Sequence, residues 1–140
     1  MDFMSDKLHN NIRFRTFNVI DDYNREVLGI DIGISISSLR VIWYLDQLAQ
    51  WHGYLKQILV DNGSEFTSSV FADWAAAHNI FVDYIERFNR SYRNEVLDCY
   101  LFNNLNEVNQ LTEDWIKVYN TERPHNSLND MTPVEYRQVA

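Results

Sequence analysis

Alternating apolar and polar residues in the first third of the chain predict β-strands. Residues 13–21 are rich in aromatic and β-branched side chains, and the turn-forming residues 21–24 follow them. Residues 26–34 are the predicted second strand of this hairpin, because every second residue is apolar and falls on one face (Leu28, Ile30, Ile32 and Ile34). Residues 2–4 are the candidate strand on the other side of 13–21.

The pattern changes to helical spacing from about residue 38, and short apolar runs separate the helices. Ser37 or Ser38 is the expected N-cap of the first helix, and Gly53 is its expected end. The expected elements are a helix to about residue 52, a strand at 57–60, a helix at 68–78, a strand at 79–82, helical segments at 84–96 and 105–120, and a helical turn at 133–138. This order predicts an α/β fold with a mixed sheet, antiparallel in its first three strands and flanked by helices.

Composition and charge narrow the class of protein. The chain has 140 residues, enough for one domain with its own core, and a single cysteine, which excludes an intrachain disulfide. It contains no apolar run long enough to span a bilayer and no signal peptide, so we expect a cytoplasmic protein with no membrane partner. The net charge of −8 has the wrong sign for simple DNA binding, but it suits a site of carboxylates that requires a divalent cation.

Three carboxylates stand where such a site is expected. Asp61 directly follows the strand at 57–60, and functional groups gather at the carboxyl ends of strands in α/β sheets. Asp2 lies between apolar residues, and Glu86 lies near the start of a predicted helix. Oxygen ligands of this kind suit Mg²⁺ or Mn²⁺. Each residue also has a purely structural interpretation: Asp61 as part of an Asp-Asn-Gly turn, Asp2 as a chain end, and Glu86 as a partner of the helix dipole.

Three separated motifs resemble one family and cover nearly the whole chain. They are DNGSEF at 61–66, YIERFNRSYRNEVLD at 84–98 and YNTERPHNSLNDMTPVEY at 119–136. They resemble the insertion-sequence (orfB-type) transposases, which carry a retroviral-integrase-like D-D-E catalytic core. The resemblance implies an RNase H-like fold with a five-stranded mixed sheet, formed by residues 1–120, and a C-terminal tail, 121–140, that packs on this core.

The same resemblance implies a function and a site. The expected activity is metal-dependent cleavage of the 3′ ends of a DNA element, followed by strand transfer into target DNA, by a homodimer that uses two Mg²⁺ or Mn²⁺ ions. Carried over by position, the catalytic metal ligands are Asp2, Asp61 and Glu86. Two alternatives stay open: an RNase H-like nuclease that only hydrolyses, and an inactive transposase remnant that acts at most as a dimerising module.

The chain departs from the family pattern at two places. Only 24 residues separate Asp61 from Glu86, about eleven fewer than the family usually has, as expected if an active-site loop before Glu86 is missing. Either the protein has lost this segment, or the protein contains it and the printed sequence does not; we favour the second, since integrase cores have a mobile loop here. The first strand is also short, because only Met1 precedes Asp2, and the family's N-terminal DNA-binding region is not expected in this chain.

The helix around Glu86 carries the remaining candidates. The number of residues between Asp61 and Glu95 is close to the number that the family has between its second Asp and its Glu. Glu95, however, lies nine residues after Glu86, which places it on roughly the opposite side of the predicted helix. The two glutamates therefore cannot serve one site. The local sequence favours Glu86 and places Glu95 on the outer face. The candidate DNA-binding residues are Arg87, Asn89, Arg90 and Arg93; the alternative is that they form a solvated basic face.

Overall fold

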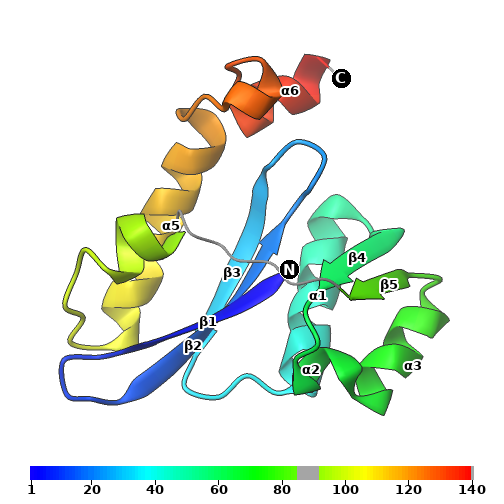
Figure 1. Cartoon of the computed structure of the whole chain (residues 1–140), viewed down its shortest axis with the longest axis horizontal. Coiled ribbons are helices and arrows are strands. Elements are labelled where there is room, and N and C mark those ends of the chain that lie inside the picture. The colour runs from blue at the N-terminus through cyan, green and yellow to red at the C-terminus, as the bar shows by residue number, and fades with distance from the viewer. Residues whose placement is uncertain (85–91, 140) are drawn as a thin grey trace.

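The computed structural model describes residues 1–84 and 92–139, and its elements follow the predicted α/β order (Figure 1). Ser37 caps the first long helix with its side chain, and Gly53 ends it with a positive φ of 75°. The strands are β1 (Asp2–Lys7), β2 (Arg13–Ile20), β3 (Val27–Gly33), β4 (Gln57–Val60) and β5 (Phe81–Tyr84). The helices are α1 (Ser38–His52), α2 (Ser64–Thr67), α3 (Ser69–Ala77), the π-helix η1 (Arg93–Leu97), α5 (Leu105–Thr121), the 3₁₀ turn η2 (Asn126–Leu128) and α6 (Pro133–Val139).

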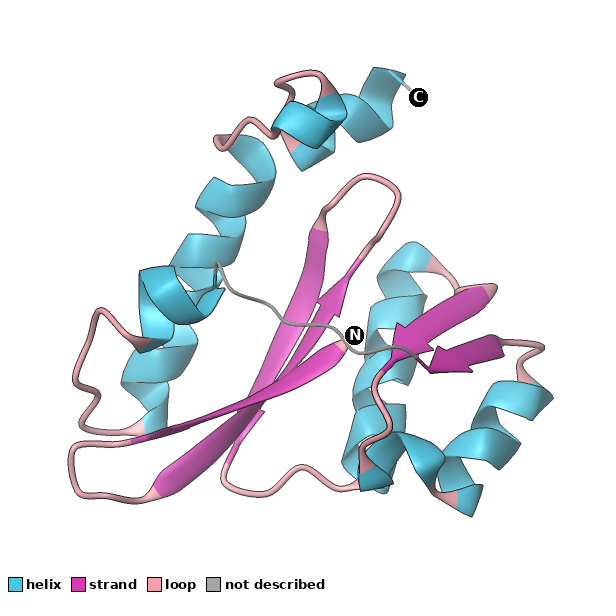
Figure 2. Ribbon diagram, in the orientation of Figure 1, coloured by secondary structure: helices cyan, strands magenta, loops and turns pink. Residues whose placement is uncertain are grey.

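The strands form two ladders, which Figure 2 shows as separate sets of arrows. The first is a three-stranded antiparallel sheet in the order β1-β2-β3, and the second is the parallel pair β4-β5. The predicted antiparallel arrangement of the first three strands is therefore confirmed. A hydrogen bond links the start of β1 to β4: the Met1 amino group donates to the Leu59 carbonyl at 2.7 Å.

Two apolar clusters cover the two faces of the antiparallel sheet, and alternate residues of each strand enter opposite clusters. The cluster beneath α1, α2 and α3 includes Phe17, Val19 and Phe66. The cluster beneath η1 and α5 includes Phe14, Ile30 and Ile32. Figure 1 shows the same arrangement, with α5 on one side of the sheet and α1 on the other. The antiparallel sheet thus lies between two helical layers.

The prediction that Leu28 shares a face with Ile30 and Ile32 is wrong. The β2–β3 register shifts between Val19 and Ile20, so that Ile20 pairs with Val27. This irregularity reverses the alternation at one end of β3, since a bulge adds a residue to one strand. Leu28 consequently packs in the α1 cluster, and Val27 joins the α5 cluster in its place.

Other element boundaries differ from the predicted ones by a few residues. The helix expected at 68–78 begins only at residue 69, because Ser68 is extended and caps α3 with its side chain, and the short α2 precedes it. The strand expected at 79–82 begins at Phe81, since Asn79 has a positive φ of 55° and Ile80 N–H donates to Ala75 O, which closes the end of α3. Tyr84, expected to be helical, ends β5.

The last residues contact the hairpin between β2 and β3. Arg137 of α6 donates two hydrogen bonds to Glu26, at 2.9 and 2.8 Å. The Tyr136 and Tyr23 rings lie 5.6 Å apart between centroids. Of the helices in the described ranges, none is long and apolar enough to cross a membrane.

Candidate active site

Asp2 lies at the start of β1, where the sheet holds its backbone. It pairs with Asn18 of β2, and only 8% of its surface is exposed. Its Oδ1 accepts a hydrogen bond from the next amide, Phe3 N–H, at 2.8 Å. The side chain therefore projects from a rigid strand, and it is far more buried than a frayed chain end would be.

Asp61 lies directly after β4, as predicted, in a turn that leads into α2. Its Oδ1 accepts a hydrogen bond from Gly63 N–H at 2.9 Å, and the Gly63 carbonyl accepts the amides of Phe66 and Thr67 at 3.0 and 3.1 Å. The Asp-Asn-Gly segment is thus a turn that also presents a carboxylate at the end of a strand. Both interpretations of this motif hold together.

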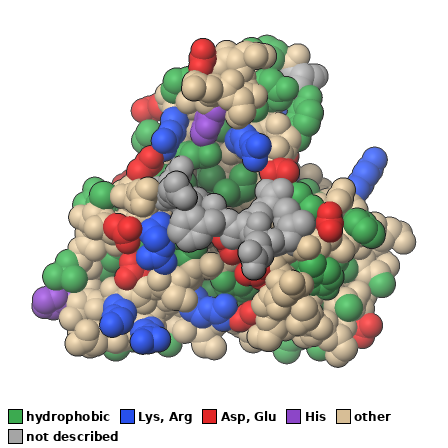
Figure 3. Space-filling view, in the orientation of Figure 1, with side chains coloured by type: hydrophobic (Ala, Val, Ile, Leu, Met, Phe, Trp, Pro, Cys, Tyr) green, Lys and Arg blue, Asp and Glu red, His purple; other side chains and the backbone are tan. Residues whose placement is uncertain are grey.

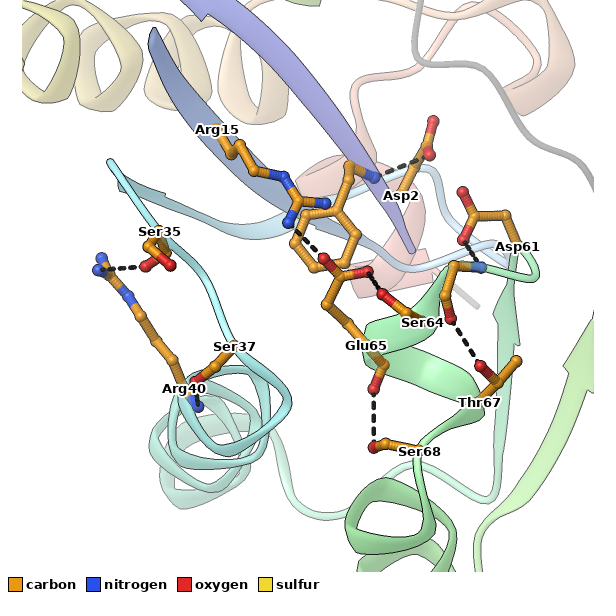
Figure 4. A network of polar contacts seen from close by, with 12 residues as sticks. Asp2, Arg15, Ser35, Ser37, Arg40, Asp61, Ser64, Glu65, Thr67 and Ser68 are labelled. Carbon is orange, nitrogen blue, oxygen red and sulfur yellow. Dashed lines mark hydrogen bonds and ion pairs between the residues drawn. The ribbon is translucent and has the colours of Figure 1, made fainter. Parts of the chain in front are cut away.

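The structure brings Asp2 and Asp61 to the same place. The hydrogen bond from Met1 to Leu59 sets the start of β1 beside the end of β4, so each aspartate lies within two residues of that contact. Figure 4 shows the Asp61 carboxylate directed toward the Asp2 side chain. Within residues 1–84 and 92–139, no cluster of three His, Cys, Asp or Glu side chains has the geometry to hold a metal ion.

The third predicted ligand, Glu86, lies outside the described residues, as do Arg87, Asn89 and Arg90. Glu95 is described, and its carboxylate accepts a hydrogen bond from Trp115 Nε1 at 2.7 Å and pairs with Arg123. These partners belong to α5 and the segment after it, not to the strands that carry the two aspartates.

Arg93, the one predicted DNA-binding residue that the structure describes, has contacts within the chain. Its Nη2 donates to the Ser5 carbonyl at 2.7 Å, and its Nη1 lies 3.5 Å from Asp98. In Figure 3 both basic and acidic side chains are scattered over the visible face. The described part of this face thus carries charges of both signs.

An ion pair beside Asp61 was not predicted from the sequence. Arg15 of β2 pairs with Glu65 of α2, and its guanidinium lies 4.4 Å from the centre of the Phe3 ring. Burial alone would raise the pKa of Glu65, but the hydrogen bonds from Arg15, its own backbone amide and Ser64, and the charge of Arg15, lower it. Glu65 therefore stays ionised next to the candidate site. No sequence signal reveals this pair, because 50 residues separate its members.

Comparison with known families gives one consistent result. Residues 1–90 match a family described as "Integrase core domain", and residues 81–133 match a second family with the same description. The chain is 35% identical over 147 positions to "Insertion element IS476 uncharacterized 39.2 kDa protein" of Xanthomonas euvesicatoria, and 34% identical over 147 positions to "Insertion element IS407 uncharacterized 31.7 kDa protein" of Burkholderia multivorans.

These matches cover 97% of this chain but only 42% and 53% of the two relatives, so the chain spans about half their length. Because 97% of this chain is about 136 residues, a match of 147 positions includes about eleven that have no counterpart here. This number equals the shortening expected between Asp61 and Glu86.

Solved structures of retroviral integrase cores share this fold. The HTLV-2 integrase catalytic core domain in complex with magnesium superposes with a TM-score of 0.75 at 16% identity, covering 96% of this chain and 94% of that one. The catalytic core domain of BIV integrase gives a TM-score of 0.63 at 16% identity, covering 99% and 93%. At these identities the likeness concerns the fold, and it confirms the expected RNase H-like class.

Proposed function

This chain belongs to the integrase core domain family, and on that premise we propose that it is the catalytic core of an insertion-sequence transposase. The proposed activity is metal-dependent cleavage of the 3′ ends of a DNA element and their transfer into target DNA. One observation carries the proposal: Asp2 on β1 and Asp61 in the turn after β4 both lie next to the hydrogen bond between Met1 and Leu59. Carboxylates held in this way at the ends of strands suit phosphoryl-transfer chemistry, in which positioning and charge stabilisation dominate.

The proposed metal ligands are Asp2, Asp61 and Glu86. The two described members offer carboxylate oxygens, the donors that Mg²⁺ and Mn²⁺ prefer. Two such ions, when bound, would activate an attacking oxygen and stabilise a leaving one. The retroviral neighbour that was solved with magnesium supports this choice of cation. The chain's own contribution is to hold Asp2 on β1 and Asp61 on the turn after β4.

We further propose that β1 joins the two ladders into one mixed five-stranded sheet. The Met1–Leu59 hydrogen bond supports this arrangement, because it is the contact that a strand beside β4 would make. Residues 1–120 would then form the core and residues 121–140 a tail that packs on it. The Arg137–Glu26 pair and the contact between the Tyr23 and Tyr136 rings support the packing of the tail.

The proposed partners are the element ends, the target DNA and a second copy of the chain. We assign DNA contacts to Arg87, Asn89, Arg90 and Arg93, which belong to the motif at 84–98. Self-association is supported by Leu39 and Trp43, which lie one turn apart on α1 with 67% and 58% of their surface exposed. Large apolar residues exposed side by side are typical of interaction surfaces.

The first experiment measures Mn²⁺ binding by calorimetry. We expect Asp61→Asn to abolish the tight component, and Asp73→Asn, which changes an exposed aspartate on α3, to leave it intact. Equal Mn²⁺ affinity in wild type and Asp61→Asn contradicts the metal site. A strand-transfer assay with a pre-cut 3′-hydroxyl end then separates the alternatives: a nuclease hydrolyses without joining, and an inert remnant does neither.

A further inference from the structure

The Arg15–Glu65 ion pair connects the two segments that carry the aspartates. Glu65 lies four residues after Asp61 on α2, and Arg15 lies on β2 beside β1. The guanidinium of Arg15 also packs over Phe3, the residue that follows Asp2, at 4.4 Å from the ring centre. The side chains of Arg15 and Glu65 are 32% and 14% exposed, so solvent screens this pair less than an ordinary surface pair.

Glu65 also packs against the turn that presents Asp61. A Cβ atom at Gly63 would lie 2.9 Å from Asp61 Oδ1 and 3.2 Å from Glu65 Oε2. The two carboxylates therefore border the same small space. Asp61 Oδ1 and Glu65 Oε2 are at most about 6 Å apart, which is the sum of these two distances. Two carboxylates this close repel each other unless a cation neutralises one of them. Arg15 supplies that cation.

We propose that Arg15 and Glu65 are positioning residues that fix the Asp61 turn relative to Asp2 and thereby set the affinity of the site for a divalent cation. This inference rests on the proposed function. Arg15 holds α2 through Glu65 and holds β1 through the Phe3 ring, so a single side chain spans both aspartate-bearing segments (Figure 4). Partners that orient metal ligands in this way typically change metal affinity when they are removed.

Glu65 acts through Arg15 and not as a metal ligand itself. Its Oε1 is engaged by Arg15, and its Oε2 lies 3.5 Å from the Ser64 hydroxyl. Across the residues that the structure describes, Asp2, Asp61 and Glu65 do not form a three-carboxylate metal cluster. The role of Glu65 is therefore to anchor the turn.

The test compares Arg15→Gln with Arg40→Gln in the 140-residue chain. Arg40 pairs with Asp31, and their side chains are 36% and 12% exposed, nearly the same exposure as the Arg15–Glu65 pair. Both variants lose a partly buried ion pair, but only one of them touches the segments of Asp2 and Asp61. Three properties are measured: the Mn²⁺ dissociation constant by calorimetry, the thermal midpoint, and amide hydrogen exchange at Phe66 and Thr67.

We expect Arg15→Gln to weaken Mn²⁺ binding about tenfold and to speed exchange at Phe66 and Thr67. Arg40→Gln should lower the thermal midpoint by a similar amount and leave both other measurements within about twofold of wild type. Arg15→Lys keeps the positive charge, so it should bind Mn²⁺ more tightly than Arg15→Gln does. It serves as the second variant if Arg15→Gln folds poorly or binds too weakly to measure.

Two failures are distinguishable. If wild type shows no Mn²⁺ binding that Asp61→Asn removes, the proposed metal site is wrong, and this inference is overturned with it. If wild type binds Mn²⁺ and Arg15→Gln binds it equally well, or if Arg15→Gln and Arg40→Gln weaken it equally, only the positioning role is overturned.

Discussion

The Asn120 side chain forms two hydrogen bonds with the backbone of Val27. Its Oδ1 accepts from Val27 N–H and its Nδ2 donates to the Val27 carbonyl, each at 2.8 Å. Asn120 is near the end of α5, and only 9% of it is exposed. β3 is the outer strand of its sheet, so this amide replaces a neighbouring strand and attaches α5 to the sheet. One side chain thus satisfies two backbone groups that burial would otherwise penalise.

Replacing Asn120 with alanine should destabilise the chain strongly. The change leaves a buried donor and a buried acceptor without their partner, which costs about 2–4 kcal/mol of unfolding free energy for the two groups together. Urea unfolding followed by circular dichroism measures this cost. Asn106→Ala, at an exposed position on the same helix, should change the free energy by less than about 0.5 kcal/mol. Similar losses for both variants would contradict the structural role of Asn120.

Alanine at Gly63 should weaken metal binding without straining the backbone. Gly63 has φ −59° and ψ 149°, which any residue adopts, but a Cβ atom would contact Asp61 Oδ1 at 2.9 Å. The carboxylate must move, and we expect Mn²⁺ affinity to fall about tenfold. Gly53→Ala is the matched control, because its φ of 75° makes alanine strained while its surroundings are open. It should cost about 1–3 kcal/mol of stability and leave Mn²⁺ binding unchanged.

A charge on the exposed face of α1 should dissociate the proposed dimer. Trp43→Glu places a carboxylate beside Leu39, on a surface that would be buried between two copies. Sedimentation velocity should show wild type as a dimer and the variant as a monomer with unchanged circular dichroism. Leu101→Glu, at a position 69% exposed in the loop before α5, should stay dimeric. A monomeric wild type, or two variants that behave alike, would contradict this surface.

Local sequence was enough to predict the elements whose signals are local. Ser37 and Gly53 bound α1 as expected, because a capping hydroxyl and a glycine with positive φ act within a few residues. The run at 57–60 is β4 without correction, since an apolar run followed by Asp-Asn-Gly has one straightforward interpretation. The position of Asp61 at the end of that strand followed from the same reasoning.

Features that depend on distant residues were not predictable. Leu28 changes faces because the β2–β3 register shifts, and a period-two pattern carries no sign of that shift. The Asn120–Val27 contact joins residues 93 positions apart, and the Arg15–Glu65 pair likewise exists only once the chain is folded. Contacts of this kind join segments far apart in the chain, so local patterns predict the elements more readily than the contacts between them.

Replacing Glu95 with an uncharged residue should lower the free energy of unfolding at neutral pH, and this effect should disappear in acid. Burial raises its pKa, but hydrogen bonds from Trp115 and Arg123 and the charge of Arg123 lower it below the ordinary 4.5. A carboxyl group with a lowered pKa in the folded state stabilises the fold above its unfolded pKa, and this contribution is lost as the pH falls through the folded value. Glu95→Gln should therefore be less stable than wild type at pH 7, by up to about 1 kcal/mol for a pair this exposed. The difference should shrink as the pH falls below 4.5. Urea unfolding at several pH values measures it, with the exposed Glu113→Gln as control; a gap that stays constant into acid would show that Glu95 stabilises by packing and not by charge.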